Sequence, residues 1–168
     1  MLGRILAAAG IELIFGGGRV GLMGIIADAA LKAGGRVVGI IPQHLIQVEV
    51  GHGSVSELIV VDSMHQRKEI MFRRADAFAV LPGGPGTLDE LFEILTWRQL
   101  RLHDKPVIIC NLDGYWQKLI DLVEHMIGQH YARPEFRDFY AVVERVEDVL
   151  PAIAAARPPE IPPQPQKI

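Results

Sequence analysis

The sequence predicts an α/β fold: a Rossmann-like, doubly wound parallel sheet flanked by helices, in a single domain. Two observations predict this class. Short apolar runs alternate with stretches that carry the helical period. The strand-like runs are nearly continuous in Val, Ile, Leu and Phe, which is typical of strands covered on both faces. A strand followed by a helix, repeated along the chain, favours parallel strands joined by right-handed crossovers.

These patterns place six strands and the helices between them. The strands are expected at Ile11–Phe15, Arg36–Ile41, Leu58–Asp62, Ala77–Leu81, Pro106–Asn111 and Tyr140–Glu144. The helices are expected at Leu2–Ala9, which Gly10 ends, and at Leu22–Lys32, Met64–Ala75, Leu88–Leu100, Tyr115–Gln129 and Val146–Ala156. Residues 43–56 are expected to form either a loop or an irregular helix.

Length and composition indicate one domain with a short tail. A chain of 168 residues buries roughly 70% of its unfolded surface, so it needs no disulfide or metal for stability. We place the domain at residues 1–156, because residues 157–168 hold five of the 11 prolines and almost no large apolar side chains. Such a segment is expected to form a flexible, extended tail.

Charge and cysteine content exclude several classes of function. The net charge of −3 gives no reason to expect attraction to nucleic acid or to a membrane surface. Uncharged stretches are well short of the roughly 20 residues that a membrane-spanning helix needs. The single cysteine, Cys110, excludes a disulfide framework and indicates a reducing, cytoplasmic environment. The histidines lack metal-ligand spacing, so no metal site is expected.

A glycine-rich loop follows the first predicted strand. Residues 16–21 read G-G-G-R-V-G and match G-x-G-x-x-G, with a strand before them and a helix after. Glycines in this context let the backbone approach a phosphate at a helix N-terminus. The acid that holds a ribose hydroxyl about 20 residues later in dinucleotide-binding folds is absent, since the second strand ends in I-I-P-Q. A tight turn with glycines for close packing remains the alternative.

A second glycine loop follows the fourth predicted strand and reads P-G-G-P-G-T-L-D-E from Pro82 to Glu90. Its backbone N–H groups, the Thr87 hydroxyl and the positive end of the next helix together form a candidate anion site. Thr87 and Glu90 are also spaced as a capping box, which is the alternative interpretation. Two acids in the first turn, Asp89 and Glu90, would tend to repel a phosphate. We therefore expect a further role for them, with a carboxylate directed at the sugar.

A third segment, residues 63–68 (S-M-H-Q-R-K), begins the helix after the third strand, and Ser63 and Gln66 form another candidate capping box. Helical spacing places two arginines, Arg67 and Arg74, in the buried arc, and it places Glu69 and Arg73 on the polar side. The apolar members of the buried arc are Met64, Ile70, Met71 and Ala75. An arginine directed towards the sheet can bind phosphate or base. The alternative is an arginine whose guanidinium reaches water.

At these three segments the sequence resembles the Lonely Guy family, which are cytokinin-activating phosphoribohydrolases formerly labelled lysine decarboxylases. The combination of M-H-x-R-K with P-G-G-x-G-T-x-x-E at this spacing carries the resemblance. It continues through T-W-R-Q-L at residues 96–100, H-D-K-P at 103–106 and N-L-D-G-Y-W at 111–116. It covers roughly Leu2 to Gln129.

The resemblance implies hydrolysis of the N-glycosidic bond of AMP or an N6-modified analogue, which releases the free base and ribose 5-phosphate. The catalytic positions would be Arg67 and Glu90. The positions that bind the substrate and its phosphate would be Gly17, Gly18, Gly21, Met64, His65, Lys68, Gly83, Gly84, Gly86 and Thr87. The family is dimeric with its active site near the subunit interface, and Trp97 is our expected interface residue. No metal or organic cofactor is implied.

The chain departs from the family pattern at its start. Family members begin with an additional strand and a small-residue loop of the C-G-S-S kind, whereas this sequence starts at the helix Leu2–Ala9. The additional strand would be central in the sheet. We expect the start to be internal to a longer reading frame. The alternative is a shortened member whose sheet and activity are compromised.

Two other classes of function are alternatives to this enzyme. Related folds carry molybdenum cofactor or sense nucleotides without hydrolysis, but such a protein has no need of a carboxylate at Glu90. An NAD-dependent enzyme is disfavoured by the acid missing after the second strand. Lysine decarboxylation would need a lysine for pyridoxal phosphate, and the pattern singles out none.

Overall fold

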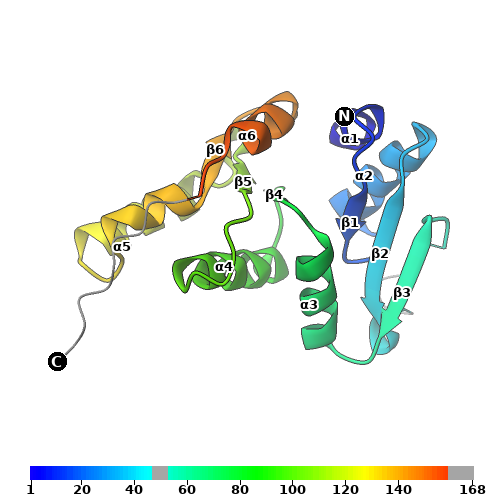
Figure 1. The fold of residues 1–168 in the computed structure, drawn as a ribbon, viewed down its shortest axis with the longest axis horizontal. Helices are drawn as coiled ribbons and strands as arrows, with labels where there is room; N and C mark the ends of the chain where they lie inside the picture. The colour runs from blue at the N-terminus through cyan, green and yellow to red at the C-terminus, as the bar shows by residue number, and fades with distance from the viewer. Residues whose placement is uncertain (47–52, 159–168) are drawn as a thin grey trace. The chain divides into compact units, whose positions relative to one another are not determined.

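The computed structural model describes residues 1–46 and 53–158, which form an α/β fold of parallel strands flanked by helices (Figure 1). The chain divides into two compact units: unit 1 spans Met1–Asp76 and unit 2 spans Ala77–Ile168. Each unit contains one three-stranded parallel sheet. The predicted fold class is confirmed.

Unit 1 contains three helices and three strands. Its sheet has the order β1-β2-β3, with Leu13 opposite Val37 and Val38 opposite Glu57. Because the strands are parallel, the loops after β1, β2 and β3 all leave the same edge of this sheet. In chain order the elements are α1 (Leu2–Ala8), β1 (Leu13–Phe15), α2 (Gly21–Lys32), β2 (Val37–Pro42), β3 (Glu57–Val61) and α3 (Met64–Arg74).

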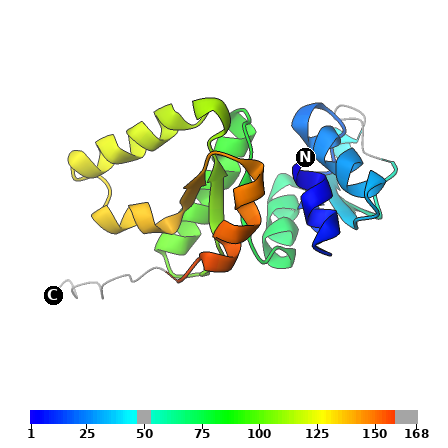
Figure 2. The ribbon, with the colours of Figure 1, turned by 90° about the horizontal axis from the view of Figure 1, so that it is seen from above.

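The core of unit 1 forms on both faces of β2, in which all six residues are buried. On one face Phe15 and Val37 pack against Ala27 and Ala30 of α2. On the other face a cluster that includes Val38 packs against residues of α3. Helix α1 lies beside α2, as Figure 2 shows. A strand covered on both sides explains why the sequence of β2 is apolar throughout rather than alternating.

Unit 2 repeats the arrangement with the sheet order β4-β5-β6. Its central strand, β5, is buried at all four residues. Helices α4 and α5 meet over Ile109 of β5, and α6 also contacts this strand. The elements are β4 (Phe78–Val80), α4 (Pro85–Gln99), β5 (Val107–Cys110), α5 (Gln117–Gly128), β6 (Ala141–Val143) and α6 (Val149–Ala155).

All six predicted strands and all six predicted helices occur, with ends that differ by at most three residues. The largest differences are at two helix starts: α4 begins at Pro85 instead of Leu88, and α6 begins at Val149 instead of Val146. A 3₁₀ helix at Pro134–Phe139 was not predicted, and another covers Gln43–Leu45 of the undecided segment 43–56. Residues 47–52 of that segment, and the predicted tail from 159 on, lie outside the described residues. In the part of the chain that is described, no helix is long and apolar enough to cross a bilayer.

Candidate functional site

The first glycine loop (residues 16–24) connects β1 to α2 in unit 1. Gly16, Gly17 and Gly18 are buried, and α2 begins at Gly21, which is exposed. Gly17 has a φ of +75°, and a Cβ there would lie 3.1 Å from the Cβ of Ile41 in β2. The close approach of this loop to β2 therefore needs glycine, as the close-packing interpretation predicts.

Arg67 of α3 closes the same edge of unit 1. Its side chain is only 5% exposed. Its Nη2 donates to the carbonyl oxygen of Gly16 at 2.7 Å, and its Nε donates to that of Ile40 at 3.1 Å. The alternative in which this guanidinium reaches water is therefore wrong. Because arginine keeps its charge when buried, unit 1 holds a fixed cation at the carboxyl ends of β1 and β2.

The start of α3 orients Arg67. Ser63 is the N-cap residue, and its hydroxyl accepts a hydrogen bond from the N–H of Gln66 at 3.2 Å. The Gln66 side chain accepts from the N–H of Asp62 at 3.0 Å, so the return bond of the predicted capping box reaches one residue further back. Met64, predicted in the buried arc, is 36% exposed, and its sulfur lies 3.7 Å from Nη1 of Arg67.

The other residues predicted on α3 lie as follows. His65 is exposed and Lys68 is half-buried. Ile70 and Met71 pack against the sheet, as predicted. Glu69 and Arg73 form an exposed ion pair on the polar side of the helix. The helical spacing therefore placed the two faces of α3 correctly, except at Met64.

The second glycine loop (residues 82–87) leads from β4 into α4 in unit 2. The helix begins at Pro85, with Gly84 as N-cap and no capping side chain. The predicted capping box of Thr87 and Glu90 is therefore wrong, and Asp89 and Glu90 do not lie in the first turn. Proline fits the first helical position because its φ is already helical and it has no N–H to satisfy. Glu90 thus lies in the second turn of α4, beyond the residues that begin the helix.

The glycines of the second loop differ in their surroundings. A Cβ on Gly83 would lie 2.1 Å from Oγ1 of Thr87, so this side chain folds back over the start of the loop. Gly84 and Gly86 are exposed, have no left-handed φ, and have no atom within 4 Å of an added Cβ. The space beside the N-terminus of α4 is open, and such a position suits an anion.

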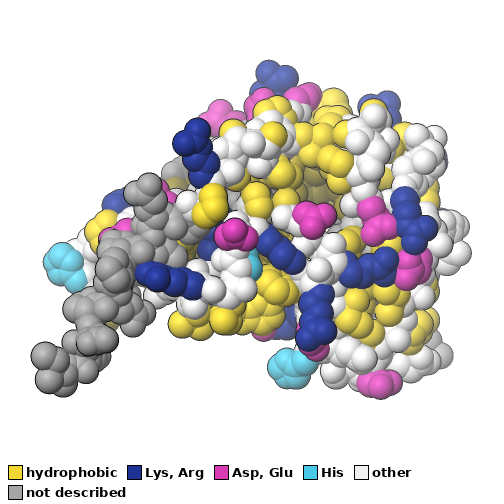
Figure 3. Space-filling model, viewed as in Figure 1, with side chains coloured by type: hydrophobic (Ala, Val, Ile, Leu, Met, Phe, Trp, Pro, Cys, Tyr) yellow, Lys and Arg dark blue, Asp and Glu magenta, His cyan; other side chains and the backbone are white. Residues whose placement is uncertain are grey.

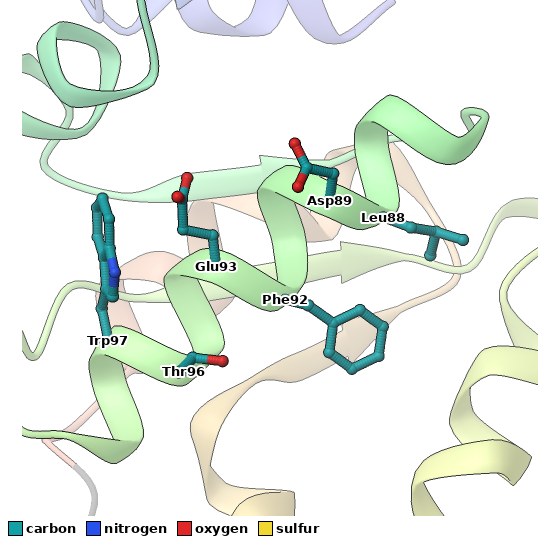
Figure 4. A pocket seen from close by; sticks show the side chains of 6 residues that line it. All are labelled: Leu88, Asp89, Phe92, Glu93, Thr96 and Trp97. Carbon is teal, nitrogen blue, oxygen red and sulfur yellow. The ribbon is translucent and has the colours of Figure 1, made fainter. Parts of the chain in front are cut away.

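Glu90 is half-buried. The surface of α4 also carries a shallow trough of about 410 Å³, which other residues of the helix line. Figure 4 shows Asp89, Glu93 and Trp97 directed to one side of this trough, at spacings of four residues. The remaining lining residues are Leu88, Phe92 and Thr96. The trough therefore combines two carboxylates with an aromatic and an apolar surface.

The sequence interpretation assigned no role to two residues of unit 2. The buried Arg98 donates to the carbonyl oxygens of Phe139 at 2.9 Å and Arg157 at 3.4 Å, and burial lowers its pKa. Tyr115 donates to the carbonyl oxygen of Gly83. Helical spacing from Leu91 could have placed Arg98 on the buried face. The contact of Tyr115 joins two loops distant in sequence, so no local pattern signals it.

At the opposite edge of the unit 1 sheet, Arg74 pairs with Glu57 through two hydrogen bonds of 2.9 and 3.2 Å. Arg36 bridges Glu57 and Glu12. Figure 3 shows basic and acidic side chains next to each other over β2 and β3. The Arg74 hydrogen bond lowers the pKa of Glu57. Its ion pairing therefore stabilises the fold above the ordinary carboxyl pKa, and this stabilisation is lost as the pH falls through the lowered value.

Two further titratable groups of unit 2 have structural roles. His103 accepts from the N–H of Lys105 at 3.1 Å, so its Nε2 donates to the carbonyl of Ile94 at 2.8 Å, and burial lowers its pKa. Burial raises the pKa of the Cys110 thiol to about 11, which confirms Cys110 as a core residue. Nowhere in residues 1–46 and 53–158 do three or more His, Cys, Asp or Glu side chains gather as they would around a metal ion.

Comparison with known proteins decides the family. The family model described as "possible lysine decarboxylase" matches residues 23–153. This chain belongs to the Lonely Guy family. A cytokinin riboside 5'-monophosphate phosphoribohydrolase of Rhodococcoides fascians is 44% identical, over 94% of this chain and 79% of its own length. A probable enzyme of the same name from Oryza sativa subsp. japonica is 43% identical, over 89% of this chain and 67% of its own length. A cytokinin riboside 5'-monophosphate phosphoribohydrolase of Arabidopsis thaliana is 38% identical, over 94% of this chain and 69% of its own length.

Solved structures share the fold of this Lonely Guy member. The molybdenum cofactor binding protein of Rippkaea orientalis aligns with a TM-score of 0.70 at 25% identity, over 92% of this chain and 82% of that one. The molybdenum cofactor carrier protein of Chlamydomonas reinhardtii aligns with a TM-score of 0.66 at 22% identity, over 91% and 81%. These likenesses support the Rossmann-like class.

Proposed function

We propose that this protein hydrolyses the N-glycosidic bond of AMP or of an N6-modified AMP and releases the base and ribose 5-phosphate. The observation that carries this proposal is the position of Glu90. It lies half-buried in the second turn of α4, directly after a loop whose exposed glycines leave open space at the helix start. The relatives described above, which are named phosphoribohydrolases, support the same reaction.

The proposed chemistry requires a carboxylate. Cleavage of a ribosyl–base bond passes through an oxocarbenium-like state with positive charge on the sugar. We assign Glu90 to stabilise that charge or to take a proton from the attacking water. Water adds its oxygen to the anomeric carbon, the bond to the base nitrogen breaks, and the base leaves with a proton. No step in this balance requires an oxidant or an added cofactor.

We assign the remaining predicted residues to binding. The open positions at Gly84 and Gly86, with Gly83 and Thr87, suit the 5'-phosphate beside the N-terminus of α4. Arg67 is assigned to fix the nucleotide through the loop that it holds, together with Gly17, Gly18, Gly21, Met64, His65 and Lys68. The assignment of both glycine loops to one nucleotide rests on the family. The free energy of phosphate binding then helps to hold the sugar in the orientation that the reaction needs.

The wider assignments follow from the family and the composition. We propose that residues 1–156 act as one nucleotide-processing domain, that the protein works in the cytoplasm, and that it forms a homodimer. The half-buried Trp97 and Phe92, which line the trough on α4, support an interface on this helix. The single cysteine is buried and un-ionised at neutral pH, which is compatible with a reducing compartment.

The decisive experiment is the replacement Glu90→Gln, with Glu69→Gln on the polar side of α3 as the matched control. We expect Glu90→Gln to lower kcat for adenine release from AMP by about 100-fold or more, the size typical for loss of acid–base catalysis. Its melting temperature should stay within about 2 °C of the parent, because glutamine keeps the shape of the side chain and Glu90 lies beyond the first turn of α4. A large fall in melting temperature with normal turnover would contradict the proposal.

A non-hydrolytic protein that binds a nucleotide or molybdenum cofactor is the second candidate, because a molybdenum cofactor binding protein aligns with a TM-score of 0.70. The assay that separates the two incubates the protein with AMP and with isopentenyl-AMP and measures free base. Release of base from either supports the enzyme. Tight binding of intact nucleotide without release of base supports a non-hydrolytic binding protein.

A further inference from the structure

The segment Asn111–Trp116 has no role in the chemistry proposed above. It follows β5, whereas the second glycine loop follows β4. Because β4 and β5 are neighbouring parallel strands, both segments leave the same edge of the unit 2 sheet. Tyr115 joins them: its hydroxyl donates to the carbonyl oxygen of Gly83 at 2.7 Å.

The turn that carries Tyr115 is held from several sides. Asp113 and Gly114 have φ values of 51° and 73°, left-handed conformations that reverse the chain after β5. The buried Asn111 accepts a hydrogen bond from the N–H of Trp116 at 2.7 Å. The Trp116 ring is 4% exposed, and the Tyr115 ring packs on it edge to face with 4.8 Å between centroids. The hydroxyl of Tyr115 is therefore presented from a well-supported position.

The hydrogen bond from Tyr115 sets the direction of one peptide group in the second glycine loop. The peptide between Gly83 and Gly84 is trans, so its C=O and N–H point in opposite directions. With the carbonyl held at Tyr115, the N–H of Gly84 is directed to the other side. Gly84 is the N-cap of α4, where N–H groups and the helix dipole favour an anion.

Two glycines in succession make this peptide easy to rotate, since glycine accepts conformations that other residues avoid. A rotated peptide would present its carbonyl oxygen to the anion position, where its negative dipole would repel a phosphate. A hydrogen-bond partner that holds the Gly83 oxygen in place therefore also favours phosphate binding, in addition to the free energy of the hydrogen bond itself.

We propose that Tyr115 is a positioning residue for the substrate phosphate: it holds the Gly83–Gly84 peptide so that the amides at the start of α4 face the anion. The identity of that anion as a nucleotide 5'-phosphate rests on the proposed function. Tyr115 is 54% exposed, so when its hydroxyl is removed the Gly83 oxygen can accept a hydrogen bond from water instead. The fold of unit 2 should therefore tolerate Tyr115→Phe.

The first test needs no ligand and measures amide hydrogen exchange of residues 83–88 in the full chain. The variants are Tyr115→Phe and, as matched control, Tyr131→Phe, whose side chain is 89% exposed. Loss of one hydrogen bond corresponds to roughly a 3- to 10-fold change. We expect exchange in this segment to be faster by that factor in Tyr115→Phe alone. Equal exchange in both variants would overturn the proposed support.

The second test measures adenine release from AMP and inhibition by inorganic phosphate. In Tyr115→Phe we expect KM for AMP and the inhibition constant of phosphate to rise by about 3- to 10-fold, with kcat within about 2-fold. A general loosening of the fold would lower kcat as well. Faster exchange with an unchanged KM would refute the positioning role.

A third measurement separates this inference from the proposed function. The affinity for AMP is compared between Glu90→Gln and the double variant Glu90→Gln/Tyr115→Phe, so that no turnover intervenes. Weaker binding by the double variant supports the role of Tyr115, and equal binding contradicts it. If neither variant nor the parent binds AMP, the proposed function fails, while the exchange test still decides whether Tyr115 holds the loop.

Discussion

The two glycine loops have similar sequences but different surroundings. In the first loop an added Cβ would lie 1.9 Å from Nη2 of Arg67 at Gly16, and 2.0 Å from the backbone oxygen of Arg19 at Gly24. In the second loop Gly84 and Gly86 face open space. The first loop thus needs glycine to pack against its own unit, whereas the second has room that its own unit does not use.

This difference separates two reasons for a glycine. Where protein atoms already occupy the site of a Cβ, glycine is explained by packing and no ligand is required. Where nothing occupies it and the backbone is not left-handed, packing does not explain the glycine, and a ligand has room to approach the backbone closely. The second loop is therefore the stronger candidate for direct phosphate contact. Gly83 is the exception within that loop, because Thr87 covers it.

The largest expected effect is a loss of protein stability when a packed glycine of the first loop is replaced. Gly24→Ala should lower the free energy of unfolding by about 3 kcal/mol, because the new Cβ would meet a backbone oxygen that cannot move cheaply. Replacing glycine by alanine normally stabilises a helix interior, so a fall in the free energy of unfolding would identify the steric clash. Urea unfolding of this variant measures the change, with Gly128→Ala in α5, where a Cβ meets open space, as the control. Equal stability of the two variants would contradict the distinction between packed and open glycines.

The next effect concerns the cation that holds the first loop. Arg67→Lys should cost about 2 kcal/mol, because a single ammonium group cannot reach the oxygens of both Gly16 and Ile40. Arg74→Lys, on the same helix, is the control. Its partner Glu57 lies at the surface, where such pairs contribute about 0–1 kcal/mol. Thermal unfolding of both variants distinguishes them, and similar losses would show that Arg67 has no special role in the loop.

The smallest effect on stability is expected in the second loop, where a change in substrate binding should accompany it. Gly86→Ala should leave the protein unchanged or about 0.5 kcal/mol more stable, because alanine suits a helix and nothing obstructs it. Its KM for AMP should nevertheless rise by about 10-fold, since the methyl group would occupy the proposed phosphate position. Steady-state adenine release gives KM. Gly128→Ala should gain similar stability with an unchanged KM, and an unchanged KM in Gly86→Ala would remove the functional explanation of the open glycines.

Sequence patterns predicted the elements well because the signals are local. Continuous apolar runs such as β2 and β5 have few alternatives to a buried parallel strand. The start of α4 was placed wrongly because two local signals compete there. Thr87 and Glu90 match a capping box, but Pro85 fits the first helical turn and begins the helix earlier. A spacing rule cannot rank these two signals, whereas the hydrogen bonds of the folded helix do.

By itself, the sequence determined the α/β class, the order of strands and helices, and the family motifs around Arg67 and Glu90. These depend on periodicity and on residue types at short spacing. Only the tertiary structure decided which glycines are packed and which are open, that Arg67 donates to carbonyls of β2 and of the loop after β1, and that Tyr115 reaches Gly83. The contacts of Arg67 and Tyr115 join residues more than 25 positions apart. They form only when parallel strands bring separate loops to one edge of a sheet. Whether a glycine is packed or open depends on where neighbouring atoms lie in the folded chain, even for a near neighbour such as Arg19 beside Gly24, so no local pattern encodes it.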